Sequence, residues 1–378
     1  MLYEIHMIKN YPPTNLNRDE MGAPKTGMFG GALRGRISSQ CFKRSWRTSE
    51  LFRSEIGAED LGIRTRQLPQ LVAEELRRRS VQEEYLTELL PKLSAFGNKD
   101  GKENKKGNYT AQMVFYAPQD IAAVADAVER RLADCAALKD VKAIKGKELQ
   151  DMVTGADIRP VTLDIALFGR MVTSNAFADV EAAMQVAHAI STNKVVMESD
   201  YFTAMDDLLR GDTMEESGSG MIGDIDYDSS CYYLYASLDT DALRSNLQYA
   251  DNPDALVRKA VPALLRTMAL TNPSGKQNSF AGHVLPSAML IECKQTKIPV
   301  SLVNAFTEPV QPNRQGDLVK NSIARLAEEA NQTGRAFGLP VEKRLWFCVD
   351  RYQEIAPENA AVCKTFAELV EQAEQALK

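Results

Sequence analysis

The amino-acid sequence predicts an α+β protein in which a sheet domain is interrupted by a mainly helical domain. Residues 2–9 alternate apolar and polar side chains as a strand does, and long helical patterns follow at 67–95 and 118–137. A β-branched and aromatic run, CYYLYASL at 231–238, then restores a strand pattern. The order strand, helix, helical insertion, strand, helix, strand is typical of α+β domains. A split β-α-β arrangement of ferredoxin type is one of those it fits.

The remaining elements follow from local patterns. A loop rich in Pro, Asn and Gly is expected at 10–31, and Ser38 or Ser39 is a good N-cap for a helix over 40–52. The polar, Gly-rich stretch 97–108 is expected to be a loop. Further helices are expected at 178–191, 253–271, 316–331 and from 364, and further strands at 284–293 and 345–349.

Length and composition narrow the class of protein. A chain of 378 residues is long enough for two or three structural units. No window approaches 18 consecutive apolar residues, and the charged start MLYEIHMIKN does not resemble a signal peptide. The six cysteines form no CxxC pair, which is typical of reduced thiols. We therefore expect a cytoplasmic globular protein without a membrane span.

Positive charge is concentrated near the N-terminus of an otherwise acidic chain. The formal net charge is −6, yet residues 1–53 contain nine Lys and Arg against four Asp and Glu, a local balance of +5. The rest of the chain therefore carries −11. Because salt confines an electrostatic field to about 10 Å, a local basic surface can bind a polyanion although the whole protein is acidic.

A helix over 40–52 would separate its cationic side chains from its aromatic ones. On a wheel of about 100° per residue, the cations lie within about 60° of Gln40 and the aromatic residues lie on the opposite side. The first face consists of Gln40, Lys43, Arg44 and Arg47, and the second of Phe42 and Trp46. Such a helix presents donors to a run of phosphates, and its N-terminus adds backbone N–H groups and serine hydroxyls.

The segment before this helix is also basic. Arg34 and Arg36 point to the same side if the segment is extended, and the pair Gly30–Gly31 permits close approach of the backbone. The alternative is an ordinary solvated amphipathic helix. Phosphate binding is favoured because these cations have no acidic neighbour three or four residues away, apart from Glu50 near Arg47.

Several motifs along the chain occur in one recognisable order. The run LNRDEMGAPKTGMFGG-x-x-R-x-RISSQCFKRSWR at 16–47 is the most specific of them. The others are DIALFGRMVTS (164–174), AHAIST (187–192), DYFTAMDDL (200–208), CYYLY (231–235) and NPSGKQNSFAGH (272–283). Together they resemble the CasC family, the backbone subunits of type I-E CRISPR Cascade complexes. Little matches in 50–150 or in the last hundred residues.

The resemblance implies a hand-shaped fold and a scaffold function without catalysis. Family members combine an RRM-like (ferredoxin-like) palm with inserted helical fingers and a thumb formed by an extended hairpin. Here the palm would comprise 1–54, 181–192 and 230–378, the fingers 55–180 and the thumb 193–229. Copies form a helical filament along a CRISPR guide RNA, and each thumb displaces one nucleotide, so that the intervening bases can pair with target DNA. The implied partners are guide RNA, target DNA, further copies and other Cascade subunits, with no cofactor, metal or membrane.

The resemblance also assigns residues to RNA. The family's palm holds the RNA backbone at the positions of Arg18, Lys25, Ser38, Gln40, Lys43 and Arg44. The charge argument adds Arg34, Arg36 and Arg47. Met171 and Phe202 stand where apolar side chains wedge beside the displaced nucleotide, because such a side chain can replace a lost base stack. Their alternative role is that of ordinary core residues.

A second basic cluster lies in the expected fingers. It consists of Lys139, Lys142, Lys145 and Lys147. A similarly Lys-rich segment of the family contacts target DNA without reading its sequence. This suits lysine, whose phosphate contacts give affinity without specificity. A solvated helix end is the competing interpretation.

Other functions are considered and several signals are rejected. Backbone subunits of related type III complexes cut target RNA through a metal and a thumb acid, and the candidates here are Asp200, Asp206, Asp207, Asp224, Asp226 and Asp228. A free-standing RNA-binding module without a filament is a third interpretation. GSGMIG (218–223) lacks the preceding strand and following helix of a dinucleotide site, and DIDYD (224–228) is followed by Ser229 where a calcium loop needs glycine. The three histidines, His6, His188 and His283, lack metal-ligand spacing.

Overall fold

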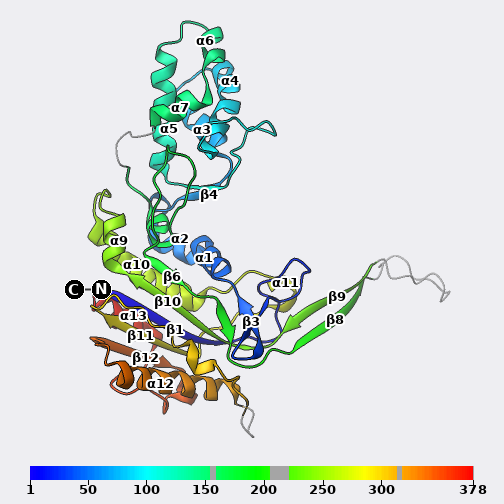
Figure 1. Ribbon diagram of the computed structural model, residues 1–378, viewed down its shortest axis with the longest axis vertical. Coiled ribbons are helices and arrows are strands. Elements are labelled where there is room, and N and C mark those ends of the chain that lie inside the picture. Colours follow the sequence, from blue (N-terminus) through cyan, green and yellow to red (C-terminus); the bar gives the residue numbers. More distant parts are fainter. Residues whose placement is uncertain (154–158, 205–220, 313–316, 378) are drawn as a thin grey trace, which may run out of the picture. The chain divides into compact units, whose positions relative to one another are not determined.

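The chain folds into two compact units, which we call the sheet unit and the helical unit. The computed structural model describes residues 1–153, 159–204, 221–312 and 317–377. The sheet unit comprises Met1–Phe52, Val186–Leu238 and Val261–Lys378, and the helical unit comprises Arg53–Gln185 and Asp239–Ala260. The sheet unit is thus assembled from three separate stretches of sequence, and the predicted α+β class is confirmed (Figure 1).

A nine-stranded mixed sheet lies at the centre of the sheet unit. Its strands follow the order β13-β12-β11-β1-β10-β7-β3-β2, and β6 pairs with β10 outside this path. β1 and β11 are antiparallel, as are β11 and β12, whereas β12 and β13 are parallel. The strands are β1 (Leu2–Asn10), β2 (Thr26–Phe29), β3 (Ala32–Ile37), β6 (Met184–Val186), β7 (Ala189–Ser191), β10 (Cys231–Asp239), β11 (Ala288–Lys294), β12 (Lys343–Cys348) and β13 (Ala361–Cys363).

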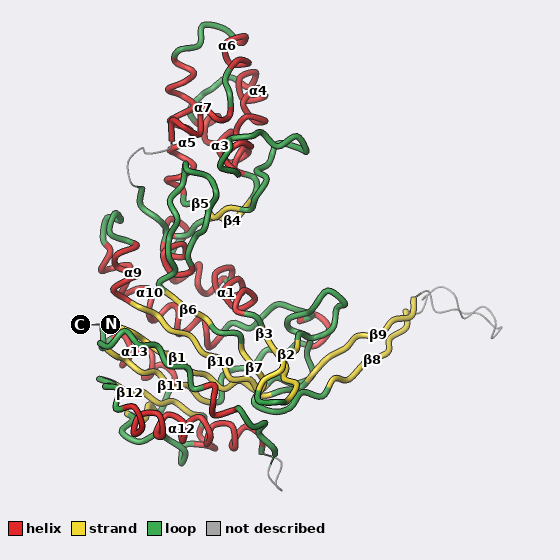
Figure 2. Tube along the Cα trace, in the orientation of Figure 1, coloured by secondary structure: helices red, strands yellow, loops and turns green. Residues whose placement is uncertain are grey.

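Helices bury both faces of this sheet (Figure 2). On one face Ile8, Leu290 and Trp346 pack with Ile323 and Leu326 of α12 (Leu318–Phe337). On the other face the Tyr3 hydroxyl donates to the Ala373 carbonyl of α13 (Phe366–Glu374). Because both faces are covered, the first eight residues of β1 are all buried, including the polar ones.

The helical unit has its own apolar core. The core residues include Leu76, Leu89, Phe96, Val128 and Leu149. The elements are β4 (Ile63–Thr65), α3 (Leu68–Arg78), α4 (Glu83–Leu93), β5 (Val114–Tyr116), α5 (Pro118–Ala133), α6 (Leu138–Ala143), α7 (Gly146–Val153), α8 (Leu163–Phe168) and α9 (Thr240–Asn246). Two helices, α2 (Glu50–Ile56) and α10 (Pro253–Leu270), each contain residues assigned to both units. Among the described residues, no helix combines the length and apolar character that a membrane span requires.

Three predicted helices differ from the observed ones. The helix expected at 40–52 ends at Thr48, because Ser49 has an extended backbone (ψ 145°), and the separate helix α2 follows. The helix expected at 67–95 is interrupted, because Ser80 adopts a left-handed φ of 66° between α3 and α4. The prediction of a helix at 178–191 is wrong, since the strands β6 and β7 occupy the second half of this range. β7 pairs with both β3 and β10, so contacts distant in sequence override the local helical pattern.

Candidate nucleic-acid interface

Helix α1 (Ser39–Thr48) separates its side chains as the helical wheel predicts. Ser38 is the N-cap, and its hydroxyl oxygen accepts the Cys41 N–H at 3.3 Å. Phe42 and Trp46 are buried, with ring centroids 5.4 Å apart. Gln40 and Arg44 are exposed, and Lys43 and Arg47 are partly exposed. The aromatic pair therefore fixes the helix on the core while its other face reaches solvent.

Hydrogen bonds bring the loop before β2 next to the start of this helix. The Asn17 side-chain oxygen accepts the Ser38 N–H at 2.9 Å, and the Lys25 N–H donates to the Asn17 carbonyl at 2.8 Å. The Arg36 N–H in turn donates to the Lys25 carbonyl at 2.8 Å. Arg18, which is exposed, lies on the same loop and forms a β-bridge with Pro24. We call the five cations of this surface the basic ridge: Arg18, Lys25, Arg36, Lys43 and Arg44.

The basic ridge lacks compensating negative charge. Within the ranges that the structure describes, none of its five cations lies within 4.0 Å of a carboxylate oxygen. In the helical unit, by contrast, Arg77 and Arg79 both form ion pairs, with Glu83 at 2.7 Å and with Asp126 at 2.5 Å. Burial lowers the pKa of Lys43, so its charged form is held at a cost that a nearby anion would offset.

His188 belongs to this surface, although the sequence offered no reason to place it there. Its Nδ1 accepts a hydrogen bond from the Arg36 guanidinium at 2.9 Å, which requires a neutral ring. Partial burial lowers the pKa of His188, and the nearby charges of Arg36 and Lys25 lower it further. A neutral His188 therefore orients Arg36 without adding charge to the basic ridge.

Arg34 corrects one sequence-based assignment. Its side chain is fully buried, and its guanidinium donates to the carbonyls of Ser191, Thr192, Phe306 and Thr307 at 2.7–3.2 Å. It joins three segments of the sheet unit and is not accessible to RNA. Gly30 likewise serves the fold, because a Cβ at this left-handed position (φ 57°) would lie 1.7 Å from the Thr307 carbonyl oxygen. Arg47 is also outside the basic ridge, because other contacts already engage it.

The segment 272–283 packs beside the basic ridge. A Cβ at Gly275 would lie 2.2 Å from the Leu16 carbonyl oxygen, next to the loop that carries Arg18. Lys276 follows with a left-handed φ of 51°, and it forms no ion pair among the described residues. Non-glycine residues in this conformation are often found at functional sites. The sequence analysis assigned no function to this motif, which it shares with the family. In the structure its lysine lies at the edge of the basic ridge.

The hairpin of β8 (Met197–Ala204) and β9 (Met221–Asp228) carries Phe202. Phe202 is partly exposed, and its ring covers Gly223 so closely that a Cβ there would lie 2.7 Å from Cζ. Residues 205–220, with Asp206 and Asp207, lie outside the described residues. Phe202 is therefore a surface residue of a two-stranded ribbon and not part of a closed core.

The acids of this hairpin do not converge. In the antiparallel register Asp200 pairs with Ile225, whereas Asp224 pairs with Tyr201 and Asp226 with Ser199, so Asp200 lies on the opposite face. Asp228 is buried, accepts the Tyr232 hydroxyl at 3.0 Å, and has a pKa that burial raises. In the part of the chain that the structure describes, no three His, Cys, Asp or Glu side chains are placed to hold a metal.

The lysine cluster of the helical unit lies on α6 and at the start of α7. Lys139, Lys142 and Lys145 are exposed. Lys142 is 3.6 Å from Glu88, and Lys147 pairs with Asp151 at 2.7 Å, so part of this charge is already neutralised.

A buried lysine holds this region. The Lys92 ammonium donates to the carbonyls of Val141, Lys142 and Ile144, at 3.0, 2.6 and 2.6 Å, at the end of α6. The substitution Lys92→Met is therefore expected to destabilise the helical unit by about 3 kcal/mol, because three carbonyls lose a charged donor. Hydrogen exchange of the amides in 138–153 checks this, with faster exchange expected. Unchanged exchange there would show that the ammonium does not cap α6.

The whole chain is similar to chains of solved CRISPR complexes and to one protein family. A chain titled "CRISPR RNA-guided surveillance complex, pre-nicking" is 26% identical over the full length of both chains, with a TM-score of 0.81. A second, titled "CRISPR RNA-guided surveillance complex", is 22% identical, also over both full lengths, with a TM-score of 0.68. No curated protein matches. The profile of one family, described as CT1975-like protein, matches residues 3–372. Together these matches confirm the resemblance to the CasC family. The chain belongs to this CT1975-like protein family.

Proposed function

We propose that this protein is the non-catalytic backbone subunit of a Cascade-type CRISPR interference complex, and that copies of it assemble along a guide RNA. In this proposal the sheet unit supplies the RRM-like palm, the helical unit the fingers, and β8–β9 part of the thumb. The partners are guide RNA, target DNA, further copies of the chain and other subunits of the complex. The similarity to chains of surveillance complexes supports this function.

The basic ridge is the observation that carries the proposal. Five cations that have no carboxylate partner among the described residues gather on one surface of a chain with a net charge of −6. A run of phosphates would compensate them, and each contact would release counterions from the nucleic acid. The proposed backbone contacts are the basic ridge, Gln40 and the neighbouring Lys276. Ser38 is buried and Arg47 is engaged by other contacts, so neither is included. Arg34 is excluded because it is buried.

The chemistry of this surface leaves the bases free. Arg and Lys on an exposed ridge bind phosphate oxygens, which carry no sequence information. Sequence recognition is then delegated to base pairing between guide and target, and the protein holds only the shape of the RNA. Met171 and Phe202 are the proposed wedges beside displaced nucleotides. Met171 has an exposed fraction of 91%, which excludes an ordinary core role.

The test is whether the recombinant chain, produced with a CRISPR array, carries guide RNA and forms assemblies that grow with RNA length. Absorbance ratio, electrophoresis of the extracted RNA and light scattering measure these properties. A chain that stays free of RNA would contradict the proposal. Small particles of constant size on any RNA would favour a free-standing module, and magnesium-dependent cutting of complementary RNA by the assembled complex would favour the type III alternative.

We further propose that the lysine cluster contacts target DNA. Changing Lys139, Lys142, Lys145 and Lys147 to Ala is expected to weaken DNA binding and to reduce the slope of log K against log salt by up to about 3.6, since each of the four lost phosphate contacts contributes about 0.9. Filter binding of duplex target at several salt concentrations measures the slope. RNA content should not change, because these residues lie outside the basic ridge. An unchanged slope would rule out the DNA contact.

A further inference from the structure

Among the residues that the structure describes, the most exposed methionine lies on a loop that hydrogen bonds hold in place. Met171 follows α8 in the helical unit, and its side chain is 91% exposed. Both of its neighbours are fixed. Arg170 and Val180 exchange backbone hydrogen bonds at 2.9 and 2.8 Å, and the Val172 N–H donates to the Asp179 carboxylate at 2.7 Å. The loop is thus closed on each side of Met171.

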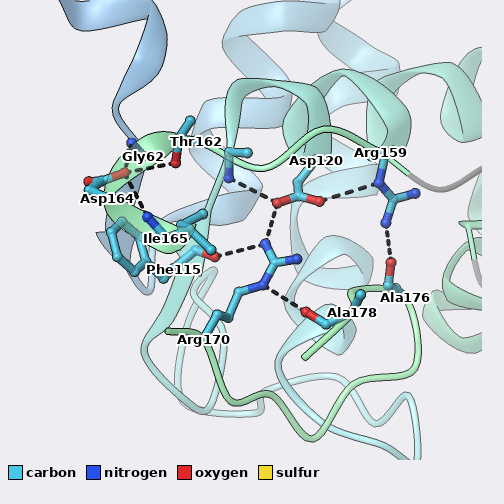
Figure 3. Close-up of polar contacts among 11 residues, drawn as sticks. Gly62, Phe115, Asp120, Arg159, Thr162, Asp164, Ile165, Arg170, Ala176 and Ala178 are labelled. Carbon is cyan, nitrogen blue, oxygen red and sulfur yellow. Dashed lines mark hydrogen bonds and ion pairs between the residues drawn. The ribbon is translucent and has the colours of Figure 1, made fainter. Parts of the chain in front are cut away.

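A buried ion pair holds the first of these neighbours (Figure 3). The Arg170 guanidinium donates to the Asp120 carboxylate at 2.6 Å, to the Phe115 carbonyl at 3.2 Å and to the Ala178 carbonyl at 2.9 Å. The Arg170 and Asp120 side chains are each 3% exposed. The same carboxylate accepts the Ala117 N–H at 2.9 Å, at the start of α5. Arg170 is therefore joined through Asp120 to the start of α5.

A second guanidinium ties the far part of the loop to the same carboxylate. Arg159 lies 3.3 Å from Asp120 and donates to the Ala176 carbonyl. The segment from 170 to 178 is consequently fixed at both ends by one acid (Figure 3). Such a network is not needed to expose a methionine, since any surface loop can do that. It is needed to keep an exposed methionine in one place.

We infer that Asp120, Arg170 and Asp179 are positioning residues that hold Met171 where it stacks against a displaced nucleotide of the guide RNA. This inference rests on the proposed function. An apolar side chain gains free energy only when a ligand covers it, and its contribution is larger when the loop is already ordered before binding. The ion pair supplies this order in the folded protein, and a nucleobase supplies the missing apolar surface.

The experiment maps reactivity of guide RNA in the assembled complex with a reagent that acylates 2′-hydroxyls. Met171→Ala defines the nucleotides whose reactivity depends on the methionine. Arg170→Gln and Asp179→Ala are expected to change the same nucleotides by up to about fivefold, which corresponds to losing about 1 kcal/mol of stacking. The double variant of Arg170→Gln with Met171→Ala is expected to add nothing to either single change, since both act on one contact.

Three outcomes separate the inference from the proposed function. If Arg170→Gln and Asp179→Ala leave the Met171-dependent nucleotides unchanged, the network is merely structural and the inference is wrong. If Met171→Ala alters no nucleotide in RNA that is still bound, the inference fails while RNA binding stands. If no variant and no wild-type chain carries RNA, the proposed function itself fails.

Two further variants guard against misfolding. Asp179 is exposed, so Asp179→Ala decides the question if Arg170→Gln does not fold. Asp134→Ala removes an exposed acid of the same unit outside the loop and is the matched control. Its reactivity profile should equal that of the wild type, and a profile like that of Asp179→Ala would show that loss of any surface acid suffices, which overturns the inference.

Discussion

Lys43→Glu combined with Arg44→Glu is expected to remove guide RNA from the purified protein. The two side chains are adjacent on α1 and reach solvent from the face opposite the buried aromatic pair. Reversing both replaces two attractions to phosphate by two repulsions, and like charges brought together cost several kcal/mol. Affinity should therefore fall at least about 100-fold. The ratio of absorbance at 260 and 280 nm, with electrophoresis of extracted nucleic acid, measures the loss.

The matched control reverses two other cations of the sheet unit. Arg351 and Lys364 are exposed and lie outside the basic ridge. The double variant Arg351→Glu, Lys364→Glu makes the same change in net charge, so it should keep its RNA if location and not total charge decides binding. Equal RNA content in both double variants would falsify the assignment of the basic ridge.

The parts of the fold that the sequence predicted are those specified by neighbouring residues. The strand at 2–9, the N-cap at Ser38 and the helix at 253–271 all have a local signal, and each is observed within a few residues. β7 has no such signal, because three residues are too few to show a period. Its register, with Arg36 opposite Ile190 and Tyr232 opposite Ser191, depends on strands far away in sequence. Short strands of this kind could not be predicted from the local pattern.

The same distinction applies to the candidate site. The face of α1 follows from helical periodicity, so Lys43 and Arg44 could be predicted as accessible cations. Their neighbours on the surface could not. His188 belongs to the same surface only because β7 pairs with β3, and Lys276 only because Gly275 packs on Leu16. The distribution of charge predicted where the candidate site lies, but which residues border it depends on the fold.

Arg34 and Arg36 show where the charge argument fails, and they provide the second large prediction. Arg34→Met is expected to lower the free energy of unfolding of the sheet unit by about 3 to 5 kcal/mol, because buried carbonyls of Ser191, Thr192 and Phe306 lose their donor. Arg36→Met should leave this free energy within about 0.5 kcal/mol, as at other surface sites. It should instead reduce the amount of bound RNA.

Urea unfolding followed by tryptophan fluorescence separates these effects cleanly. Both tryptophans of the chain, Trp46 and Trp346, lie in the sheet unit, so the signal does not report the helical unit. If Arg36→Met unfolds as early as Arg34→Met, the Arg36 side chain is part of the fold and leaves the proposed RNA surface. If Arg34→Met keeps wild-type stability, the carbonyls of Ser191, Thr192 and Phe306 do not depend on its guanidinium. We thus expect two arginines of the same strand, two residues apart, to divide between folding and binding according to what surrounds their guanidinium groups and not according to their charge.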